Sequence, residues 1–300
     1  MTLRSQSVEQ SSPHQTAGTA DGIKPQLQCG IQRALISVII TTYNRTDALN
    51  AVLRALAAQT DRGFEVVVAD DGSDQQTAQL LEPWSASFVR LGHVWHEHRN
   101  FRAAEIRNRA ILQSCGELCV FLDGDCIPRP NFIQVHRRLA EPGWFVAGNR
   151  VLLSRQLTER ILADHLEPER WALRQWVETR LRGDINRLQP LLSLPLGPLR
   201  RLGGAAWRSI RSANLAIGRA DLLRVDGFDA AFSGWGREDS DLVLRLMHSG
   251  TRRKDGRFAT AVLHLWHAEN DRSRLPVNDL LLHAAFRDGR TKAQIGLSSL

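Results

Sequence analysis

The sequence predicts an α/β fold with a mostly parallel central sheet flanked by helices, and three observations support this. Apolar runs at 34–40, 64–69 and 120–122 have the length and composition of buried strands. Segments with helical spacing separate these runs, as in βαβ units, whose strands are parallel and whose crossover is right-handed. The chain has 300 residues, of which 43% are hydrophobic, and this is enough for a sizeable core.

The expected elements alternate regularly up to residue 148. A helix is expected after the first strand, with Thr46 at its N-terminus and with Leu49, Val52 and Leu56 on its apolar face. Further strands are expected at 88–95 and 144–148, and further helices near 75–81, 103–111 and 132–139. This alternation is typical of a doubly wound sheet.

The second half of the chain is less regular. Residues 158–181 have helical spacing, and prolines 190, 195 and 198 interrupt the stretch that follows. A helix is then expected at 242–247 and a strand at 259–265.

Two carboxylates, Asp123 and Asp125, follow the strand at 120–122 with only Gly124 between them. Two acids this close repel each other unless a proton, a basic side chain or a divalent metal shares their charge. Ligands of open α/β sheets bind at the carboxyl ends of strands. The pattern therefore indicates a cation site, and the alternative for an isolated D-x-D is a solvated acidic turn.

Three other strand ends carry polar residues, at Thr41–Arg45, Asp70–Asp74 and His264–His267. Imidazole with carboxylate suits Mn, Zn or Fe, whereas carboxylate with a substrate phosphate suits Mg or Mn. On a strand, H-x-x-H places its rings on opposite faces, so at most one ring is expected to bind metal; on a turn both can. The alternative is one histidine packed beside Trp266.

A second histidine cluster, His93, His96 and His98, also has a metal-like spacing. It falls on an expected strand without a nearby cysteine, and we therefore do not interpret it as a metal site.

Residues 234–239 have the sequence G-W-G-R-E-D. The glycines free the backbone to expose Trp235, and sugar faces stack well on such a ring. Glu238 and Asp239 follow closely enough to reach a sugar hydroxyl, which a general base must do. The alternative is a helix N-terminus with acids at the positive end of its dipole.

Together these segments resemble a known family. Residues 37–44, 68–73, 107–108 and 122–125 are similar to successive signatures of glycosyltransferase family 2, nucleotide-sugar enzymes of the GT-A fold. Residues 227–229, 234–239 and 264–267 are similar to the carboxyl-terminal region of beta-1,4-galactosyltransferases and related bacterial polysaccharide enzymes. The resemblance covers about residues 35–274, apart from an arginine-rich middle, and implies a GT-A fold with a C-terminal acceptor and metal subregion.

The resemblance implies a donor site in the first half of the chain. Thr41 and Tyr43 would flank the base and ribose of the donor, with Arg45 in the same site, and Asp71 would hydrogen-bond the uracil. Arg107 would approach the donor as well.

The resemblance also implies a site for Mn²⁺ or Mg²⁺. Asp125 would bind the metal, Asp123 would contact ribose or metal, and His267 would complete the metal shell. His264 stands where the galactosyltransferases use a methionine, which leaves its role as a ligand open.

On the acceptor side, Asp239 matches the catalytic base, Glu238 an acceptor contact and Trp235 a sugar-stacking ring. The implied reaction is inverting transfer of a sugar from a UDP-sugar to a hydroxyl of a saccharide or lipid-linked acceptor, in cell-surface polysaccharide or lipopolysaccharide biosynthesis. Arg102 departs from the family pattern, which usually has glycine there.

The formal net charge is +7, and it is concentrated in residues 170–211, which carry nine arginines against two acids. Arginines beside tryptophans and leucines suit an anionic membrane surface, so we expect peripheral attachment to the inner face of the cell membrane. The alternative is a solvated helical face that covers the acceptor cleft. No nucleic-acid partner is expected.

Composition and the resemblance together imply a domain organisation. We expect a disordered tail at 1–33, a single domain at 34–285 and a C-terminal tail at 286–300. The expected parts of the domain are a nucleotide-sugar-binding half at 34–150, an arginine-rich helical insert at 158–211 and an acceptor, catalytic and metal half at 212–275. Because the tail lacks the apolar region of a signal peptide and no window of about twenty residues is apolar, a cytoplasmic location is expected.

Two other functions are compatible with parts of the sequence. Nucleotidyl transfer to a sugar phosphate uses a related fold, but the glycine-rich basic loop is absent after the first strand. A noncatalytic protein that binds anionic surfaces would explain the basic segment but leaves the ordered acids and histidines unexplained.

Overall fold

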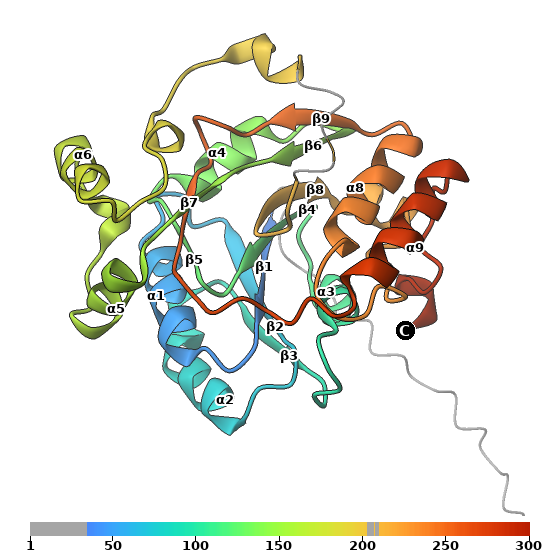
Figure 1. Ribbon diagram of the computed structural model, residues 1–300, viewed down its shortest axis with the longest axis horizontal. Helices are drawn as coiled ribbons and strands as arrows, with labels where there is room; N and C mark the ends of the chain where they lie inside the picture. Colours follow the sequence, from blue (N-terminus) through green and yellow to red (C-terminus); the bar gives the residue numbers. More distant parts are fainter. Residues whose placement is uncertain (1–34, 203–206, 208–209) are drawn as a thin grey trace, which may run out of the picture. The chain divides into compact units, whose positions relative to one another are not determined.

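The computed structural model describes residues 35–202, 207 and 210–300 (Figure 1). The tail expected at 1–33 lies outside these residues, as does the first residue of the strand expected at 34–40. In the described part of the chain, no helix combines the length and the apolar character that a membrane crossing needs.

A seven-stranded sheet forms the centre of the fold. Its order is β3-β2-β1-β4-β8-β6-β9. Four neighbouring strands are parallel: β3 (Leu91–Trp95), β2 (Phe64–Asp70), β1 (Ile36–Thr42) and β4 (Leu118–Asp123). The antiparallel strand β8 (Asn214–Gly218) joins them to the parallel pair β6 (Trp144–Ala147) and β9 (Arg252–Asp255). The predicted α/β fold with a mostly parallel sheet is therefore confirmed.

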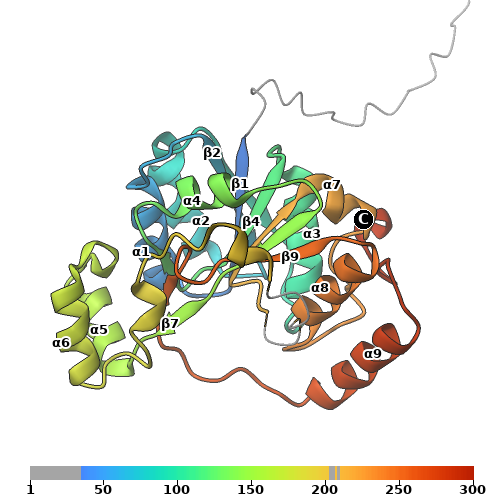
Figure 2. The same ribbon diagram turned by 90° about the horizontal axis from the view of Figure 1, so that it is seen from above.

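Helices cover both faces of this sheet (Figure 2). On one face lie α1 (Thr46–Ala57), α2 (Gln75–Leu81) and α4 (Phe132–Leu139). On the other lie α3 (Ala103–Gln113), α7 (Arg219–Arg224), α8 (Glu238–His248) and α9 (Leu275–Arg287). Within β1, Val38 and Ile40 belong to one core and Ile39 to the other, which explains why the strand is apolar at successive positions.

A small second sheet has the order β5-β10-β7, formed by β5 (Cys126–Pro128), β10 (Val262–His264) and β7 (Arg150–Leu152). Its register pairs His264 with Cys126, the residue after Asp125. This pairing brings the end of β10 beside the carboxylates that follow β4.

The arginine-rich insert differs from the expectation of one helical stretch at 158–181. It forms α5 (Arg155–Ala163), a 3₁₀ turn (Pro168–Arg170) and α6 (Leu173–Leu181). The break has a physical reason, because His165 has a positive φ of 51° and Pro168 lacks the N–H that a continuing helix needs. Further 3₁₀ turns occupy Gln189–Leu191 and Gly197–Arg201.

Two other boundaries differ from those expected. The strand expected at 88–95 begins only at Leu91, after a 3₁₀ turn at Glu82–Ser87. Residues 286–300, expected as a tail, include the end of α9 and a 3₁₀ turn at Leu297–Ser299, and Leu297 is buried in the core.

Candidate active site

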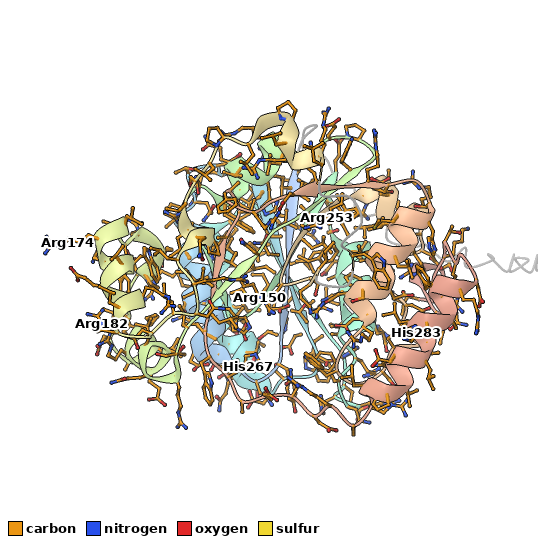
Figure 3. The ribbon with its side chains drawn as sticks, turned by 45° about the horizontal axis from the view of Figure 1, so that its top comes forward. Arg150, Arg174, Arg182, Arg253, His267 and His283 are labelled. Atoms are coloured by element: carbon orange, nitrogen blue, oxygen red, sulfur yellow. The ribbon has the colours of Figure 1, made fainter. Side chains whose placement is uncertain are left out.

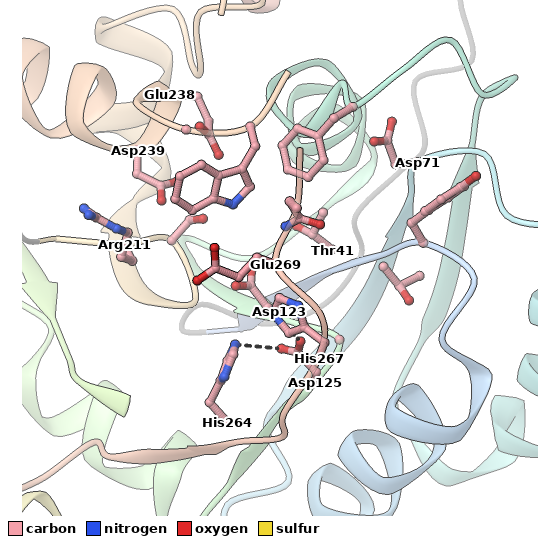
Figure 4. A pocket seen from close by; sticks show the side chains of 18 of the residues that line it. Thr41, Asp71, Asp123, Asp125, Arg211, Glu238, Asp239, His264, His267 and Glu269 are labelled. Atoms are coloured by element: carbon pink, nitrogen blue, oxygen red, sulfur yellow. Dashed lines mark ion pairs between the residues drawn. The ribbon is translucent and has the colours of Figure 1, made fainter. Parts of the chain in front are cut away.

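A cleft of about 850 Å³ lies at the carboxyl ends of β1, β4 and β10 and at the N-terminus of α8 (Figure 4). All of the site residues predicted from the sequence line it: Thr41, Tyr43, Arg45, Asp71, Arg107, Asp123, Asp125, Trp235, Glu238, Asp239, His264 and His267. Their roles are not tested by this placement, but segments more than 200 residues apart in the chain meet there.

Strand register explains part of this convergence. In the parallel sheet Thr41 lies opposite Asp123, and Thr42 opposite Asp70. The residues after these positions therefore leave the sheet at the same edge, where ligands of open α/β sheets bind.

Arg107, on α3, lines the cleft and is buried. Its guanidinium donates to Thr41 Oγ1 at 2.9 Å and to Glu238 Oε1 at 3.2 Å. It also lies 3.4 Å from Asp123 Oδ1 and 3.7 Å from Asp239 Oδ1. One cation thus contacts three carboxylates: Asp123 at the end of β4, and Glu238 and Asp239 at the start of α8.

Burial affects the protonation of two of these acids. Desolvation, with repulsion from Asp239, raises the pKa of Glu238 to about 7. Desolvation also raises the pKa of Asp123 to about 6, although Arg107 opposes the shift. Arg107 alone therefore does not neutralise the carboxylates around it.

Asp125 faces two imidazole rings. His264 Nε2 lies 3.5 Å from Asp125 Oδ1, and His267 Nε2 lies 3.5 Å from Asp125 Oδ2. β10 ends at His264, and the chain after it has no regular structure, so the strand expected at 259–265 is shorter than predicted. The H-x-x-H motif therefore begins at the last residue of the strand and continues outside it. In this arrangement both rings can face one carboxylate.

These three side chains fit a divalent metal. The Nδ1–H of His267 donates to the carbonyl oxygen of Ala268 at 2.6 Å, which leaves Nε2 with a lone pair toward Asp125. Desolvation lowers the pKa of His264 to about 4, so the imidazole of His264 is neutral at pH 7. Both separations exceed hydrogen-bond length, and nitrogen with carboxylate oxygen is a donor set that suits Mn²⁺.

Cys126 is also close to this group but is not a suitable ligand. One donor atom from each of Asp125, Cys126 and His264 lies within 4.8 Å of the others. Burial raises the pKa of the Cys126 thiol well above its ordinary value, so the thiol keeps its proton and points to Asp125 Oδ1 at 3.6 Å.

The G-W-G-R-E-D segment leads into α8, which begins at Glu238. Gly234, Gly236 and Arg237 all have positive φ, and these turns direct Trp235 into the cleft. The Arg272 guanidinium lies 5.1 Å from the Trp235 ring centroid. Glu238 and Asp239 are in the first turn of the helix and also line the cleft, so both interpretations of the G-W-G-R-E-D segment apply.

Several cleft residues were not predicted from the sequence: Arg150, Arg211, Trp266, Glu269 and Arg272. Arg150 lies on a three-residue strand too short to give a periodic signal. Trp266 is 41% exposed inside the H-x-x-H motif, and its ring lies 5.1 Å from the Arg155 guanidinium. Its position in the sequence between the candidate ligands His264 and His267 could have identified Trp266 as a cleft residue.

The chain matches two family models. One, described as glycosyl transferase family 2, matches residues 37–190. The other, described as the N-terminal domain of galactosyltransferase, matches residues 205–267.

Among curated proteins, the chain is 32% identical over 232 residues to validoxylamine A glucosyltransferase of Streptomyces hygroscopicus subsp. jinggangensis (strain 5008), with 72% of this chain and 52% of that protein covered. It is 25% identical over 240 residues to hyaluronan synthase of Pasteurella multocida, with 77% of this chain and 24% of that protein covered. The chain therefore spans about half the length of the first relative and a quarter of the second.

Solved structures share the fold. S. aureus TarS 1–349 aligns with a TM-score of 0.59 at 17% identity, covering 88% of this chain and 67% of that one. Mannosyltransferase PcManGT from Pyrobaculum calidifontis, in complex with GDP-Man and Mn²⁺, aligns with a TM-score of 0.52 at 17% identity, covering 86% and 72%.

Proposed function

The chain belongs to glycosyltransferase family 2 and has the GT-A fold, and from this premise we propose that it is an inverting, metal-dependent transferase that uses a UDP-sugar. The acceptor in this proposal is a hydroxyl of a saccharide or of a lipid-linked saccharide. The observation that carries the proposal is that one cleft is lined both by the Asp125–histidine group and by the Glu238–Asp239 pair, which Arg107 contacts.

Asp239 is the general base in this proposal. Its carboxylate would accept the proton of the acceptor hydroxyl as the oxygen attacks the anomeric carbon from the face opposite the leaving diphosphate, and this inverts the configuration. Glu238, whose pKa is raised to about 7, retains much of its proton at neutral pH and can donate a hydrogen bond to the acceptor.

Negative charge develops on the leaving diphosphate during transfer. Asp125, His264 and His267 would hold the metal, which supplies positive charge for the diphosphate when bound. Arg107 would bind at the same end of the donor, since it already joins Thr41 to Asp123.

Solved structures with the same fold support a nucleotide-sugar donor and a divalent metal, and the named relatives support a saccharide acceptor. S. aureus TarS 1–349 has been solved in complex with UDP, and PcManGT with GDP-Man and Mn²⁺. Two relatives are named hyaluronan synthase and chondroitin synthase, which favours a role in polysaccharide biosynthesis.

The test is a panel of UDP-sugars with and without Mn²⁺. A ligand that binds the native state raises its stability, so UDP or the correct donor should raise the Tm only when the metal is present. UDP release should then follow with the same donor. Nucleotide binding by a GDP-sugar alone would change the donor class, and no stabilisation by any nucleotide would contradict the proposal.

We also propose peripheral attachment to an anionic membrane, on a narrower surface than residues 170–211. Arg200 is buried and donates to the carbonyl oxygens of Asp255 and Arg257, so it serves the fold. Arg211 lines the cleft. Of the arginines that are exposed, we choose those on the outer face of α6, where Arg174 points away from the domain (Figure 3).

The α6 face combines exposed apolar side chains with arginines. Leu173, Val177 and Leu181 are spaced at i, i+4 and i+8 and are 53%, 38% and 82% exposed. Such a stripe beside Arg174 and Arg180 suits a headgroup interface.

Flotation with phosphatidylglycerol vesicles tests this surface. Leu173→Ser with Leu181→Ser should reduce vesicle binding, whereas Leu280→Ser with Arg287→Gln, on the exposed side of α9, is the matched control. If the unmodified protein does not float at low salt, or if only the α9 variant loses binding, the α6 assignment is wrong.

A further inference from the structure

The three histidines before α3 remain unexplained by the proposed function. His96 and His98 are not among the cleft-lining residues of the described chain, yet each contacts a residue that is. Their contacts converge on Tyr43 and Asp71, the residues expected at the nucleobase end of the donor site.

His96 holds the side chain of Asp71. Its Nε2 lies 2.6 Å from Asp71 Oδ1, and both residues are buried. A carboxylate only accepts, so Nε2 carries the proton and donates it. The backbone N–H of Arg102 donates to the other oxygen, Oδ2, at 2.9 Å. Asp71 is therefore fixed in one rotamer at the N-terminus of α3, where a negative charge is favourable.

His98 holds the ring of Tyr43. The two rings stack with centroids 4.4 Å apart and planes 14° from parallel. His98 Nδ1 also lies 3.0 Å from the carbonyl oxygen of Asp71, so this nitrogen carries the proton. Behind it, a Cβ on Gly72 would lie 2.4 Å from the backbone nitrogen of His98, so only glycine allows this approach.

From these contacts we infer that His96 and His98 are positioning residues that set the nucleobase specificity of the donor site. The inference rests on the proposed function. With its rotamer fixed, the Asp71 carboxylate accepts from a donor at one position in the cleft. Uracil has a donor at ring position N3, whereas cytosine has an acceptor at N3 and its donor is the amino group at N4, so a cytosine placed like uracil would set two acceptors against each other.

The free face of the Tyr43 ring sets the position of the base. Tyr43 is 44% exposed, and His98 covers one side of its ring. The open side is left for a base to stack on, at a distance from Asp71 that His98 fixes through its hydrogen bond to the Asp71 carbonyl. Stacking alone tolerates every base, so the discrimination depends on Asp71 and hence on His96.

The test compares the binding of UDP and CDP by calorimetry, in the presence of Mn²⁺, for the full chain and its variants. His96→Ala should weaken UDP binding about tenfold and CDP binding less than twofold, because a hydrogen-bonded carboxylate is released. His96→Gln, whose amide can also donate to Asp71, should restore most of the UDP preference. The KM for the donor should rise in His96→Ala, while kcat at saturating donor changes less than twofold.

His93 provides the matched control. It makes the same kind of pair with Asp70, at 3.0 Å, but Asp70 does not line the cleft among the described residues. His93→Ala should therefore leave the ratio of UDP to CDP affinity unchanged, even if it lowers the Tm as much as His96→Ala does.

The outcomes separate this inference from the proposed function. If the unmodified chain binds no nucleotide, the proposed function fails. If it binds UDP but His96→Ala keeps the UDP preference while the Tm falls as in His93→Ala, His96 has only a structural role and the inference is wrong. Equal affinity of the unmodified chain for UDP and CDP would overturn it too.

Discussion

Arg107 shows how one buried side chain sets the chemistry of its neighbours. Its guanidinium contacts Asp123, Glu238 and Asp239, yet the pKa values of Asp123 and Glu238 remain raised because the cleft is desolvated. The site thus has more carboxylates than its resident cation can balance. A proton on Glu238 reduces this excess, and a divalent metal at Asp125 would reduce it further.

At the residue scale, the base assignment gives the first prediction. Asp239→Asn should reduce turnover by about 10²- to 10⁴-fold, the contribution expected of positioned acid–base catalysis. The change removes the proton acceptor but keeps the size of the side chain, so UDP and Mn²⁺ should still raise the Tm as in the unmodified protein.

Glu238→Gln is the matched control for this experiment. It removes the neighbouring carboxylate, which is not assigned as the base, and should lower turnover mainly through the KM for the acceptor. If Asp239→Asn retained near-normal turnover while Glu238→Gln lost it, the two assignments would have to be exchanged.

The raised pKa of Glu238 gives a second prediction, on stability. Between its ordinary pKa and the folded value of about 7, the unfolded chain is ionised while the folded protein keeps the proton. The free energy of unfolding should therefore fall as pH rises from about 5 to 7, by an amount on the order of 2 kcal/mol from this group.

Urea denaturation at several pH values measures this slope. Glu238→Gln cannot ionise and should lose less stability over that range. Parallel pH profiles for the two proteins would show that Glu238 ionises freely in the folded state.

At the element scale, the limits of the sequence prediction have physical causes. Long apolar strands and periodic helices such as 34–40 and 103–111 were identified because periodicity reports burial. The three-residue strands β5 and β7 are too short to give such a signal, although β5 pairs with β10 and so brings His264 beside Cys126 and Asp125. Likewise α9, buried only at three positions, has a weak apolar pattern and was not predicted.

The turn at the end of β10 gives the third prediction. Since both rings face Asp125 at 3.5 Å, His264→Gln and His267→Gln should each weaken Mn²⁺ binding by about tenfold or more. Asp125→Ala should weaken it further, because the carboxylate is the charged member of the group. Electron paramagnetic resonance of Mn²⁺ measures the free ion directly, without enzyme turnover.

His283, on α9 and outside the cleft-lining residues described, is the matched histidine for this measurement (Figure 3). His283→Gln should bind Mn²⁺ like the unmodified protein. If His264→Gln alone left Mn²⁺ binding unchanged, only His267 and Asp125 would be ligands, as in the family pattern without a second histidine.

At the scale of the whole molecule, residues 294–297 support the part of the cleft formed by α3. The buried carboxylate of Asp229 accepts from the backbone N–H groups of Gln294 and Ile295 at 2.9 and 3.2 Å. Next to Asp229, Phe228 exchanges two hydrogen bonds of 2.8 Å with the side chain of Asn108, the neighbour of Arg107 on α3. The terminal segment is thus connected to Arg107 through two contacts.

Deletion of residues 293–300 should therefore destabilise the protein and impair the site. Asp229 would lose two of its three backbone donors while remaining buried, and Leu297 would leave the core. A buried carboxylate that loses its partners costs about 3 kcal/mol or more, so the Tm should fall by roughly 10 °C in a domain of this size. Differential scanning calorimetry measures the change, and deletion of the half-exposed Leu300 alone is the control.

Because α3 carries Arg107, turnover should fall further than the loss of folded protein explains. A truncated chain with an unchanged Tm would mean that these residues do not stabilise the domain.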